Sequence, residues 1–249
     1  MAFLVPARFC GPPSSGNGGW VSGHLARLVA TAPDRPAVTV RLRTPPPLDR
    51  GMAVVESGGV WEVTDGEHLV AQAQAAAGPE RGGIPAPVSF EDALVAGERY
   101  EGLADHPFPS CFSCGTAREV GDGLRLRPGR VGDSDLYAAV WVPADDVDVE
   151  TVWAALDCPG GWASGIAGRP MVLGTMTARV DTQPVAGEPH VVMAWQRGEE
   201  GRKHFSGTAL YAGDGTLLAQ AEATWIAIDP TSVRPASSAS SVSPAGGTA

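Results

Sequence analysis

The 249-residue chain has no apolar run approaching the about 20 residues of a membrane-spanning helix, so we expect no transmembrane segment. Positive charge is scarce as well, with 18 Lys and Arg residues against 28 Asp and Glu residues and a formal net charge of -10. Non-specific nucleic-acid binding relies on clustered Lys and Arg, and the composition argues against it. The N-terminal sequence MAFLVPARF lacks the basic region and long apolar stretch of a signal peptide, which favours a cytoplasmic protein.

Cysteine is also rare, and four cysteines in a chain of this length do not form a dense disulfide framework, so free thiols are expected. Cys111 and Cys114 have the spacing of half a zinc site, but structural zinc needs four ligands and no second CxxC or His pair exists. Cys10, Cys158 and His106 would complete the set only through folding that the sequence does not show. The favoured interpretation is a turn with small buried thiols, and no metal site is predicted.

An internal sequence repeat limits the choice of fold more than the composition does. The hexapeptide GGWVSG of residues 18–23 returns as GGWASG in residues 160–165. A second repeated segment follows each hexapeptide: residues 65–75 resemble residues 214–223, and both segments begin with Asp-Gly. Two matched landmarks in matched order predict that the chain contains one structural unit twice.

Each predicted unit is a helix followed by an antiparallel meander. Asn17 is a good helix N-cap, apolar residues recur at helical spacing from Val21 to Ala32, and Pro33 ends that helix. The strands expected after it are residues 37–44, 52–56, 60–64 and 69–76. In the second unit a helical segment at 152–156 is expected to kink or restart at Pro159 and to continue at 162–167. The strands expected in that unit are residues 124–127, 136–142, 172–183, 190–196, 204–212 and 217–228.

The sequence CFSCG of residues 111–115, followed by GLRL in residues 123–126, resembles the CFxCG and GLxL opening of hot dog thioesterases related to phenylacetate-pathway enzymes. The AALD sequence of residues 154–157 is similar to the helical stretch of that family, which ends in an acidic residue. The first unit looks like the N-terminal half of a double hot dog acyl-CoA thioesterase. The resemblance implies an α+β fold, a tandem (double) hot dog in which two antiparallel sheets each wrap a central helix.

The resemblance also implies a division of the chain. We expect an N-terminal hot dog unit at residues 1–80, a linker at 81–105 and a C-terminal hot dog unit at 106–230. Within the linker, residues 90–102 form a short helix or a surface loop. The tail at 231–249 is rich in Ser, Ala, Pro and Gly and is expected to be disordered. Acyl thioesters would bind at the seam between the helix of one unit and the sheet of the other.

Asp157 is the only acidic residue at the family's helix position, which implies a general base or nucleophile for thioester hydrolysis. Backbone N–H groups of Gly160 and Gly161 at a helix start would hold the developing oxyanion. Ser164 would contact the substrate. Two simpler interpretations stay open: Asp157 as a helix cap, and the Gly-Trp-x-Ser-Gly sequence as a site of close helix-to-sheet packing.

Arg202 and Lys203, together with His204, form the only compact basic cluster of the sequence. The resemblance places them at the start of a strand near the seam, where they would meet the phosphates of coenzyme A. A solvated strand end explains them equally well. Coenzyme A would enter as part of the substrate, and no other cofactor is expected.

One departure from the family leaves the activity open. Relatives carry His-Gly-Gly shortly before the acidic residue, whereas this chain has ETVW at residues 150–153, and Trp153 would fill space that a substrate needs. Two functions remain: an acyl-CoA thioesterase, and a non-catalytic acyl-CoA or lipid-binding protein on the same scaffold. A Ser-His-Asp hydrolase is disfavoured because the Gly-x-Ser-x-Gly elbow is missing. The expected partner is a small acyl thioester, with no nucleic acid and no membrane, and the resemblance allows a homodimer.

Overall fold

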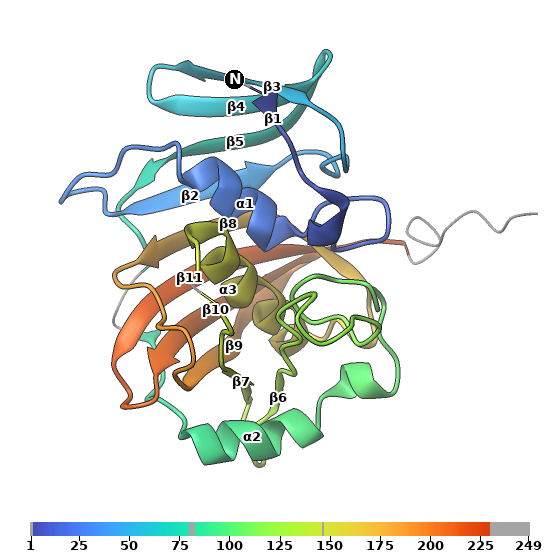
Figure 1. Ribbon diagram of the computed structural model, residues 1–249, viewed down its shortest axis with the longest axis vertical. Coiled ribbons are helices and arrows are strands. Elements are labelled where there is room, and N and C mark those ends of the chain that lie inside the picture. The colour runs from blue at the N-terminus through green and yellow to red at the C-terminus, as the bar shows by residue number, and fades with distance from the viewer. Residues whose placement is uncertain (1, 80–82, 146, 230–249) are drawn as a thin grey trace, which may run out of the picture.

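The computed structural model describes residues 2–79, 83–145 and 147–229 and places their strands in one antiparallel sheet of 11 strands (Figure 1). The strands of the first half are β1 (Ala2–Phe3), β2 (Ala37–Leu42), β3 (Met52–Ser57), β4 (Val60–Asp65) and β5 (His68–Ala76). Those of the second half are β6 (Gly129–Arg130), β7 (Leu136–Trp141), β8 (Met171–Val180), β9 (His190–Glu200), β10 (Lys203–Ala212) and β11 (Leu217–Ala227). Their order across the sheet is β1-β3-β4-β5-β2-β8-β11-β10-β9-β7-β6.

The two halves of the sheet have the same strand order when they are read outward from the middle. One side runs β2-β5-β4-β3 and the other runs β8-β11-β10-β9. The central strands β2 and β8 are antiparallel, with Val38 opposite Ala178, and the hydroxyl oxygens of Thr39 and Thr177 lie 2.7 Å apart. The prediction of two sheets is therefore wrong. A single sheet forms because β2 and β8 hydrogen-bond to each other through backbone N–H and C=O groups that would be unpaired at the edges of two separate sheets.

Three α-helices occur in the part of the chain that the structure describes: α1 (Gly18–Ala26), α2 (Phe90–Glu98) and α3 (Val149–Ala163). Figure 1 shows α1 and α3 in front of the middle of the sheet, and α2 across the end where β6 and β7 lie. A large apolar core fills the space between the sheet and helices α1 and α3, while α2 contributes Ala93 and Ala96 to a smaller cluster with Ala138 and Met193. Of the two alternatives for residues 90–102, a short helix or a surface loop, the structure shows a helix over Phe90–Glu98. The structure also describes the 3-10 helices η1 (Ala7–Phe9) and η3 (Glu101–Leu103).

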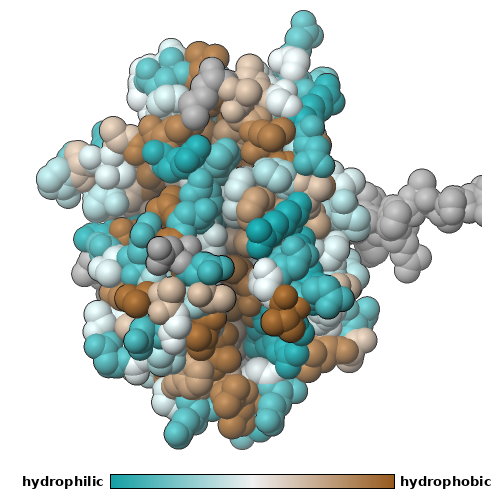
Figure 2. All heavy atoms as spheres, in the orientation of Figure 1, coloured by the Kyte–Doolittle hydropathy of each residue, from teal (hydrophilic) through white to brown (hydrophobic). Residues whose placement is uncertain are grey.

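Apolar and polar side chains are mixed over the face shown in Figure 2, and apolar ones gather toward its lower edge, where Figure 1 places α2. Leu94 and Val95 of that helix are each 54% exposed. None of the helices among residues 2–79, 83–145 and 147–229 has the length and apolar character needed to cross a membrane.

The first helix begins as the sequence predicts and ends earlier. Asn17 is its N-cap, with the side-chain oxygen accepting a hydrogen bond from the backbone N–H of Trp20 at 2.8 Å. The helix ends at Ala26, short of the predicted end at Ala32. The amides of Leu28 and Val29 bond to carbonyls three residues back, so the chain tightens into a 3-10-like turn well before Pro33.

The second central helix, α3, runs from Val149 to Ala163 with Pro159 inside it. Of the two predicted outcomes at that proline, a kink or a restart, the restart is therefore wrong. Proline in a helix interior costs about 3 kcal/mol because it removes a hydrogen bond and crowds the preceding turn. Burial of the surrounding residues offsets that cost: Leu156, Cys158 and Trp162 are all at most 8% exposed. Burial on every side therefore holds the segment helical where local preference would interrupt it.

Glycines of the first hexapeptide allow the two central helices to touch along their backbones. A Cβ atom at Gly19 would lie 2.6 Å from the carbonyl oxygen of Trp153, and one at Gly23 would lie 2.7 Å from Cα of Glu150. The predicted close packing is thus helix against helix in this copy, because a glycine at both places leaves room for α3.

In the second hexapeptide the glycines face the sheet. A Cβ atom at Gly161 would lie 3.0 Å from the Trp225 ring of β11, and one at Gly160 would meet the hydroxyl of Ser206 on β10. The prediction of helix-to-sheet packing holds for this copy. Trp20 and Trp162, the matched tryptophans of the two hexapeptides, both lie in the core and are 5% and 2% exposed.

Most predicted strands match observed ones, with ends that differ by a few residues. The strand predicted at residues 124–127 is wrong. The amides of Leu124 and Leu126 bond instead to the carbonyls of Phe112 and Ser113, and Arg125 between them has a φ of 51°, which breaks an extended run. The predicted disordered tail at residues 231–249 lies outside the described residues.

Candidate functional site

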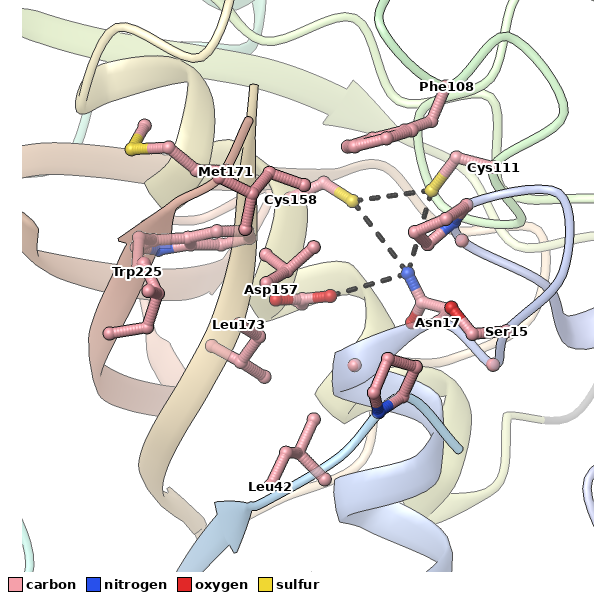
Figure 3. A pocket seen from close by; sticks show the side chains of 18 of the residues that line it. Ser15, Asn17, Leu42, Phe108, Cys111, Asp157, Cys158, Met171, Leu173 and Trp225 are labelled. Atoms are coloured by element: carbon pink, nitrogen blue, oxygen red, sulfur yellow. Dashed lines mark hydrogen bonds between the residues drawn. The ribbon is translucent and has the colours of Figure 1, made fainter. Parts of the chain in front are cut away.

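A cavity of about 390 Å³ lies between the first and second halves of the chain, next to the N-terminus of α1. Its walls come from the loop before α1, the end of β2, the CFSCG loop, α3, the start of β8 and the end of β11. Most of the wall is apolar, and Figure 3 shows Leu42, Phe108, Met171, Leu173 and Trp225 around it. Such a cavity suits an apolar group that also meets a few polar side chains.

Asp157 forms the polar end of this cavity and is only 2% exposed. Its Oδ2 atom accepts hydrogen bonds from the backbone N–H of Gly19 at 2.9 Å and from the side-chain amide of Asn17 at 3.3 Å. Its Oδ1 atom has no hydrogen-bond partner among the described residues. Burial raises the pKa of this carboxyl to about 8, against the opposing effect of the hydrogen bonds from Gly19 and Asn17. One oxygen is therefore held by the first half of the chain, and the other is buried without a hydrogen-bond partner among the described residues.

Asn17 both caps helix α1 and donates a hydrogen bond to Asp157, and the sequence indicated only the first of these roles. Its side-chain oxygen caps α1, and this leaves its amide nitrogen directed at Asp157 and at two sulfur atoms (Figure 3). The nitrogen lies 3.5 Å from Sγ of Cys111 and 3.8 Å from Sγ of Cys158. The sequence predicted Asn17 as an N-cap only, because partners about 100 residues or more away leave no trace in local spacing.

Three cysteines meet beside Asp157. The sulfur atoms of Cys111, Cys114 and Cys158 all lie within 4.8 Å of one another, and those of Cys111 and Cys158 are 3.5 Å apart. All four cysteines are free and buried. The pKa of Cys111 lies well below its usual range because the other two thiols and the N–H groups of Ser113 and Cys114 donate to its sulfur. Burial raises the pKa of Cys114, and the neighbouring sulfur of Cys111 raises that of Cys158.

Asp157 is the one predicted site residue that lines the cavity. Gly160 and Gly161 lie in the last turn of α3, and the premise that they start a helix is wrong, because α3 continues through Pro159. Ser164 caps the C-terminus of that helix, buried and outside the cavity wall. None of these three lines the cavity, and the continuous helix places Gly160 and Gly161 against Ser206 and Trp225 of the sheet.

Arg202 lies in the exposed turn between β9 and β10, and Lys203 is the exposed first residue of β10; neither lines the cavity. The carbonyl of Arg202 accepts a hydrogen bond from the amide of Ala227, whose neighbours Ile226 and Ile228 do line the cavity. The basic pair is therefore near the rim. Lys203 also lies 3.9 Å from the carboxylate of Glu200, so part of its charge is already compensated.

Arg43 is the only Lys or Arg in the cavity wall among the described residues, and no sequence pattern singles it out. Its guanidinium donates twice to the side-chain oxygen of Gln72, at 3.1 and 2.8 Å. Arg43 as a whole is exposed. A lone arginine just before the Pro-Pro-Pro segment of residues 45–47 carries no motif. The position of Arg43 becomes clear only in the structure, where the end of β2 lies beside the cavity.

The residues that replace His-Gly-Gly join the two helices and lie outside the cavity wall. Oε1 of Glu150 lies 3.1 Å from Nδ1 of His24, within hydrogen-bond distance, and 3.3 Å from Nε of Arg27, with which it forms an ion pair. Trp153 packs against Gly23 and is 3% exposed. The expectation that Trp153 fills substrate space is therefore wrong, because the side chain is taken up by contact between α1 and α3.

We expect Glu150→Gln to lower the free energy of unfolding at neutral pH by about 1 to 3 kcal/mol, because His24 and Arg27 lose a charged partner. Burial raises the pKa of Glu150, but the hydrogen bond from His24 and the charge of Arg27 outweigh it and hold the pKa below its usual value. A carboxyl with a lowered folded-state pKa stabilises the fold above its unfolded pKa, and that contribution is lost as the pH falls through the lowered value.

Urea denaturation of wild type and Glu150→Gln across a pH series measures this effect. The difference between them should be largest near neutral pH and should shrink as the pH falls below the usual glutamate range. The exposed Glu119 offers a control, since Glu119→Gln should track wild type throughout. A difference that stays constant with pH would contradict a role for the ionised carboxylate.

No family model matches the sequence, and no curated protein matches it. The fold is similar to that of the tesB protein of Mycobacterium avium subspecies paratuberculosis, at 11% identity and a TM-score of 0.57 over 91% of each chain. A hot dog fold protein of Alicyclobacillus acidocaldarius is 13% identical, with a TM-score of 0.56 over 92% of this chain and 93% of its own. An acyl-CoA thioesterase II of Mycobacterium marinum is 11% identical, with a TM-score of 0.51 over 88% and 93%.

The chain therefore has a hot dog fold like that of solved thioesterase structures, and the resemblance found in the sequence is confirmed at the level of the fold. The identities are too low to carry an activity across, and a fold of this kind hosts more than one chemistry.

Proposed function

We propose that this protein is an acyl-CoA thioesterase-like hydrolase with a tandem hot dog architecture. The observation that carries the proposal is the buried carboxylate of Asp157 at the polar end of an apolar cavity, with Oδ2 held by Gly19 and Asn17 and Oδ1 unpartnered among the described residues. A buried carboxylate oxygen without a partner is costly unless a ligand or a water molecule uses it.

The tandem arrangement is supported by the order of elements. In each half a helix is followed by four strands that lie in the same order from the middle of the sheet outward. The boundaries near residues 80 and 106 remain part of this proposal. The residues between them include α2, which packs on the second half through Ala93 and Ala96. The cavity draws residues from both halves, as the proposed seam requires.

The chemistry follows from the two ends of the cavity. The apolar wall would bury the acyl chain, and Asp157 would take a proton from a water molecule whose oxygen attacks the thioester carbonyl carbon, or would attack that carbon itself. Gly18 at the N-terminus of α1 lines the cavity, so the positive end of the helix dipole would favour the developing oxyanion. The carbon–sulfur bond then breaks, and the coenzyme A thiolate leaves and is protonated. After direct attack by Asp157, a water molecule would hydrolyse the resulting anhydride, which releases the acid and restores the carboxyl group.

The rim would hold the coenzyme A phosphates, with Arg43 as first contact and Arg202 and Lys203 beside it. We expect Arg43→Ala to raise KM for an acyl-CoA about 10-fold, equivalent to about 1.4 kcal/mol, with kcat unchanged because the residue is remote from the carbonyl. Steady-state kinetics on acyl-CoA and on the matching acyl-pantetheine, which has no phosphates, measure the effect.

The variant and wild type should behave alike on acyl-pantetheine. Arg130→Ala serves as the control variant, because Arg130 lies on the edge strand β6 and pairs with Asp135. An Arg43→Ala effect of the same size on both substrates would show that the guanidinium does not contact phosphate.

A second function, binding of an acyl thioester without turnover, is favoured by one observation. The family's His-Gly-Gly is replaced by residues that join α1 to α3 through Glu150 and Trp153. The test is coenzyme A release from short, medium and long acyl-CoA substrates, combined with calorimetric titration of the same compounds. Turnover supports the hydrolase. Binding with no turnover at any chain length supports the binding protein, and neither binding nor turnover contradicts both.

A further inference from the structure

The strongest feature that the proposed function does not use is the cluster of Cys111, Cys114 and Cys158. Two of these come from the CFSCG loop and the third comes from α3, next to Asp157. Their sulfur atoms converge within 4.8 Å without any disulfide. Four-coordinate zinc with Zn–S bonds of about 2.3 Å places neighbouring sulfurs about 3.8 Å apart. The 3.5 Å between Cys111 and Cys158 is close to that spacing.

We propose that Cys111, Cys114 and Cys158 bind one zinc-type divalent cation through their thiolates, with the fourth coordination position at the cavity. Thiolate sulfur is the ligand type that selects such thiophilic metals over calcium and magnesium. The donor set is therefore specific for a soft or borderline cation.

The loop that carries two of the ligands is held in place before any metal binds. The N–H of Gly115 donates to the carbonyl of Cys111 at 2.9 Å. The hydroxyl of Tyr100 donates to the carbonyl of Cys114 at 2.9 Å. The hydroxyl of Ser113 donates to the carbonyl of Ala154, which ties the loop to the helix of the third ligand. Little rearrangement is needed to close the site.

The described residues supply three ligands and no fourth. His106 is occupied, since its Nε2 atom lies 3.2 Å from the carbonyl of Cys114 and its Nδ1 atom accepts from the N–H of Phe108 at 2.9 Å. A neutral imidazole has one donor and one acceptor, so both are used. Cys10 lies elsewhere, with its sulfur 3.2 Å from both the carbonyl of Ser110 and the guanidinium of Arg118. Asn17 presents an amide N–H to the sulfurs and therefore supports them as a hydrogen-bond donor.

All three cysteines line the cavity, so a water molecule or a ligand thiol can reach the fourth position from that side. Three protein ligands with one open position is the arrangement of reactive zinc sites, whereas purely structural sites are closed by four. The sequence-based expectation of no metal rested on the missing fourth ligand and on the unknown position of Cys158. The fold brings Cys158 to the pair and supplies an opening in place of a fourth residue.

The test is metal binding by the purified, reduced full-length protein. Elemental analysis after incubation with Zn²⁺ and removal of the excess should give one zinc per chain, and Co²⁺ should give the sulfur-to-cobalt charge-transfer absorption of thiolate ligands. Competition with a chromophoric zinc chelator gives the affinity. We expect Cys111→Ser, Cys114→Ser and Cys158→Ser each to weaken it by at least about 100-fold, above the loss that removal of a supporting residue causes. Cys10→Ser, at a buried cysteine outside the cluster, is the matched control and should bind as wild type does.

The wild-type measurements keep the proposal testable if a serine variant does not fold. Less than one-tenth equivalent of zinc on protein with four titratable thiols would overturn it. So would a Cys111–Cys158 disulfide in the reduced preparation, seen by mass, or loss of cobalt binding in Cys10→Ser equal to that of the other three. Because the readout is metal content, the result is independent of whether the protein hydrolyses acyl-CoA.

Discussion

Asp157→Asn is expected to lower kcat for acyl-CoA hydrolysis by about 10²- to 10⁴-fold, the range that a positioned general base contributes. Asparagine keeps the size of the side chain, and its carbonyl oxygen can still accept from the N–H of Gly19 and the amide of Asn17, so the contact between the helices is retained. The change removes the basic oxygen, together with the charge that Asp157 carries at a pH above its raised pKa of about 8. Coenzyme A release at saturating substrate measures kcat, and urea denaturation checks that the fold is intact.

Asp148→Asn is the matched control for this substitution. Asp148 is the exposed N-cap of the same helix, where its side chain accepts from the N–H of Thr151 at 2.8 Å, and asparagine caps a helix about as well. Its kcat and KM should equal those of wild type. Unchanged kcat in Asp157→Asn would remove Asp157 from the mechanism and leave the cavity as a binding site.

Gly19→Ala is expected to lower the free energy of unfolding by about 3 kcal/mol, the upper end of the usual cost of overpacking a core. Alanine in a helix is favoured over glycine by about 1 kcal/mol, so local preference alone predicts stabilisation. The new methyl group would instead lie 2.6 Å from the carbonyl oxygen of Trp153 and against the side chain of Asp157, and α1 and α3 would have to separate. Thermal and urea denaturation measure the loss, which corresponds to about 6 to 12 °C in Tm for a chain of this size.

Gly51→Ala provides the control, because nothing lies within 4 Å of a Cβ atom at that position and its φ is outside the left-handed region. It should leave stability unchanged or slightly raise it through a lower entropy of the unfolded chain. If Gly19→Ala were as stable as Gly51→Ala, the close approach of the helices would not depend on this glycine. The variant should also lose activity, since Gly19 holds Asp157 through its N–H.

Features set by neighbouring residues could be predicted from the sequence. Asn17 caps the first helix as predicted. The two Asp-Gly pairs lie in the turns that precede β5 and β11, where Gly66 and Gly215 have φ values of 60° and 85°. Such turns require a conformation that glycine adopts without strain, so residue type alone indicates them.

The wrong predictions concern segments whose conformation depends on distant partners. Pro159 favours an interruption, but burial of α3 on all sides keeps the helix continuous and turns Gly160 and Gly161 away from the cavity. Leu124 and Leu126 alternate like a strand, but their amides bond to the CFSCG loop. In both segments tertiary contacts outweigh local preference, as they commonly do.

The sequence by itself determined the local elements, the repeated order of helix and strands, and the hot dog resemblance that pointed to Asp157. Only the tertiary structure decided which groups surround that carboxylate. Asn17 and Gly19 reach it from about 140 residues away, and Cys111 and Cys158 meet beside it although 47 positions separate them. The physical reason is that turns and caps depend on residues adjacent in the chain, whereas the cavity is made where two helices, two strand ends and a loop converge. Spacing along the sequence therefore does not indicate which of these distant residues meet at the cavity.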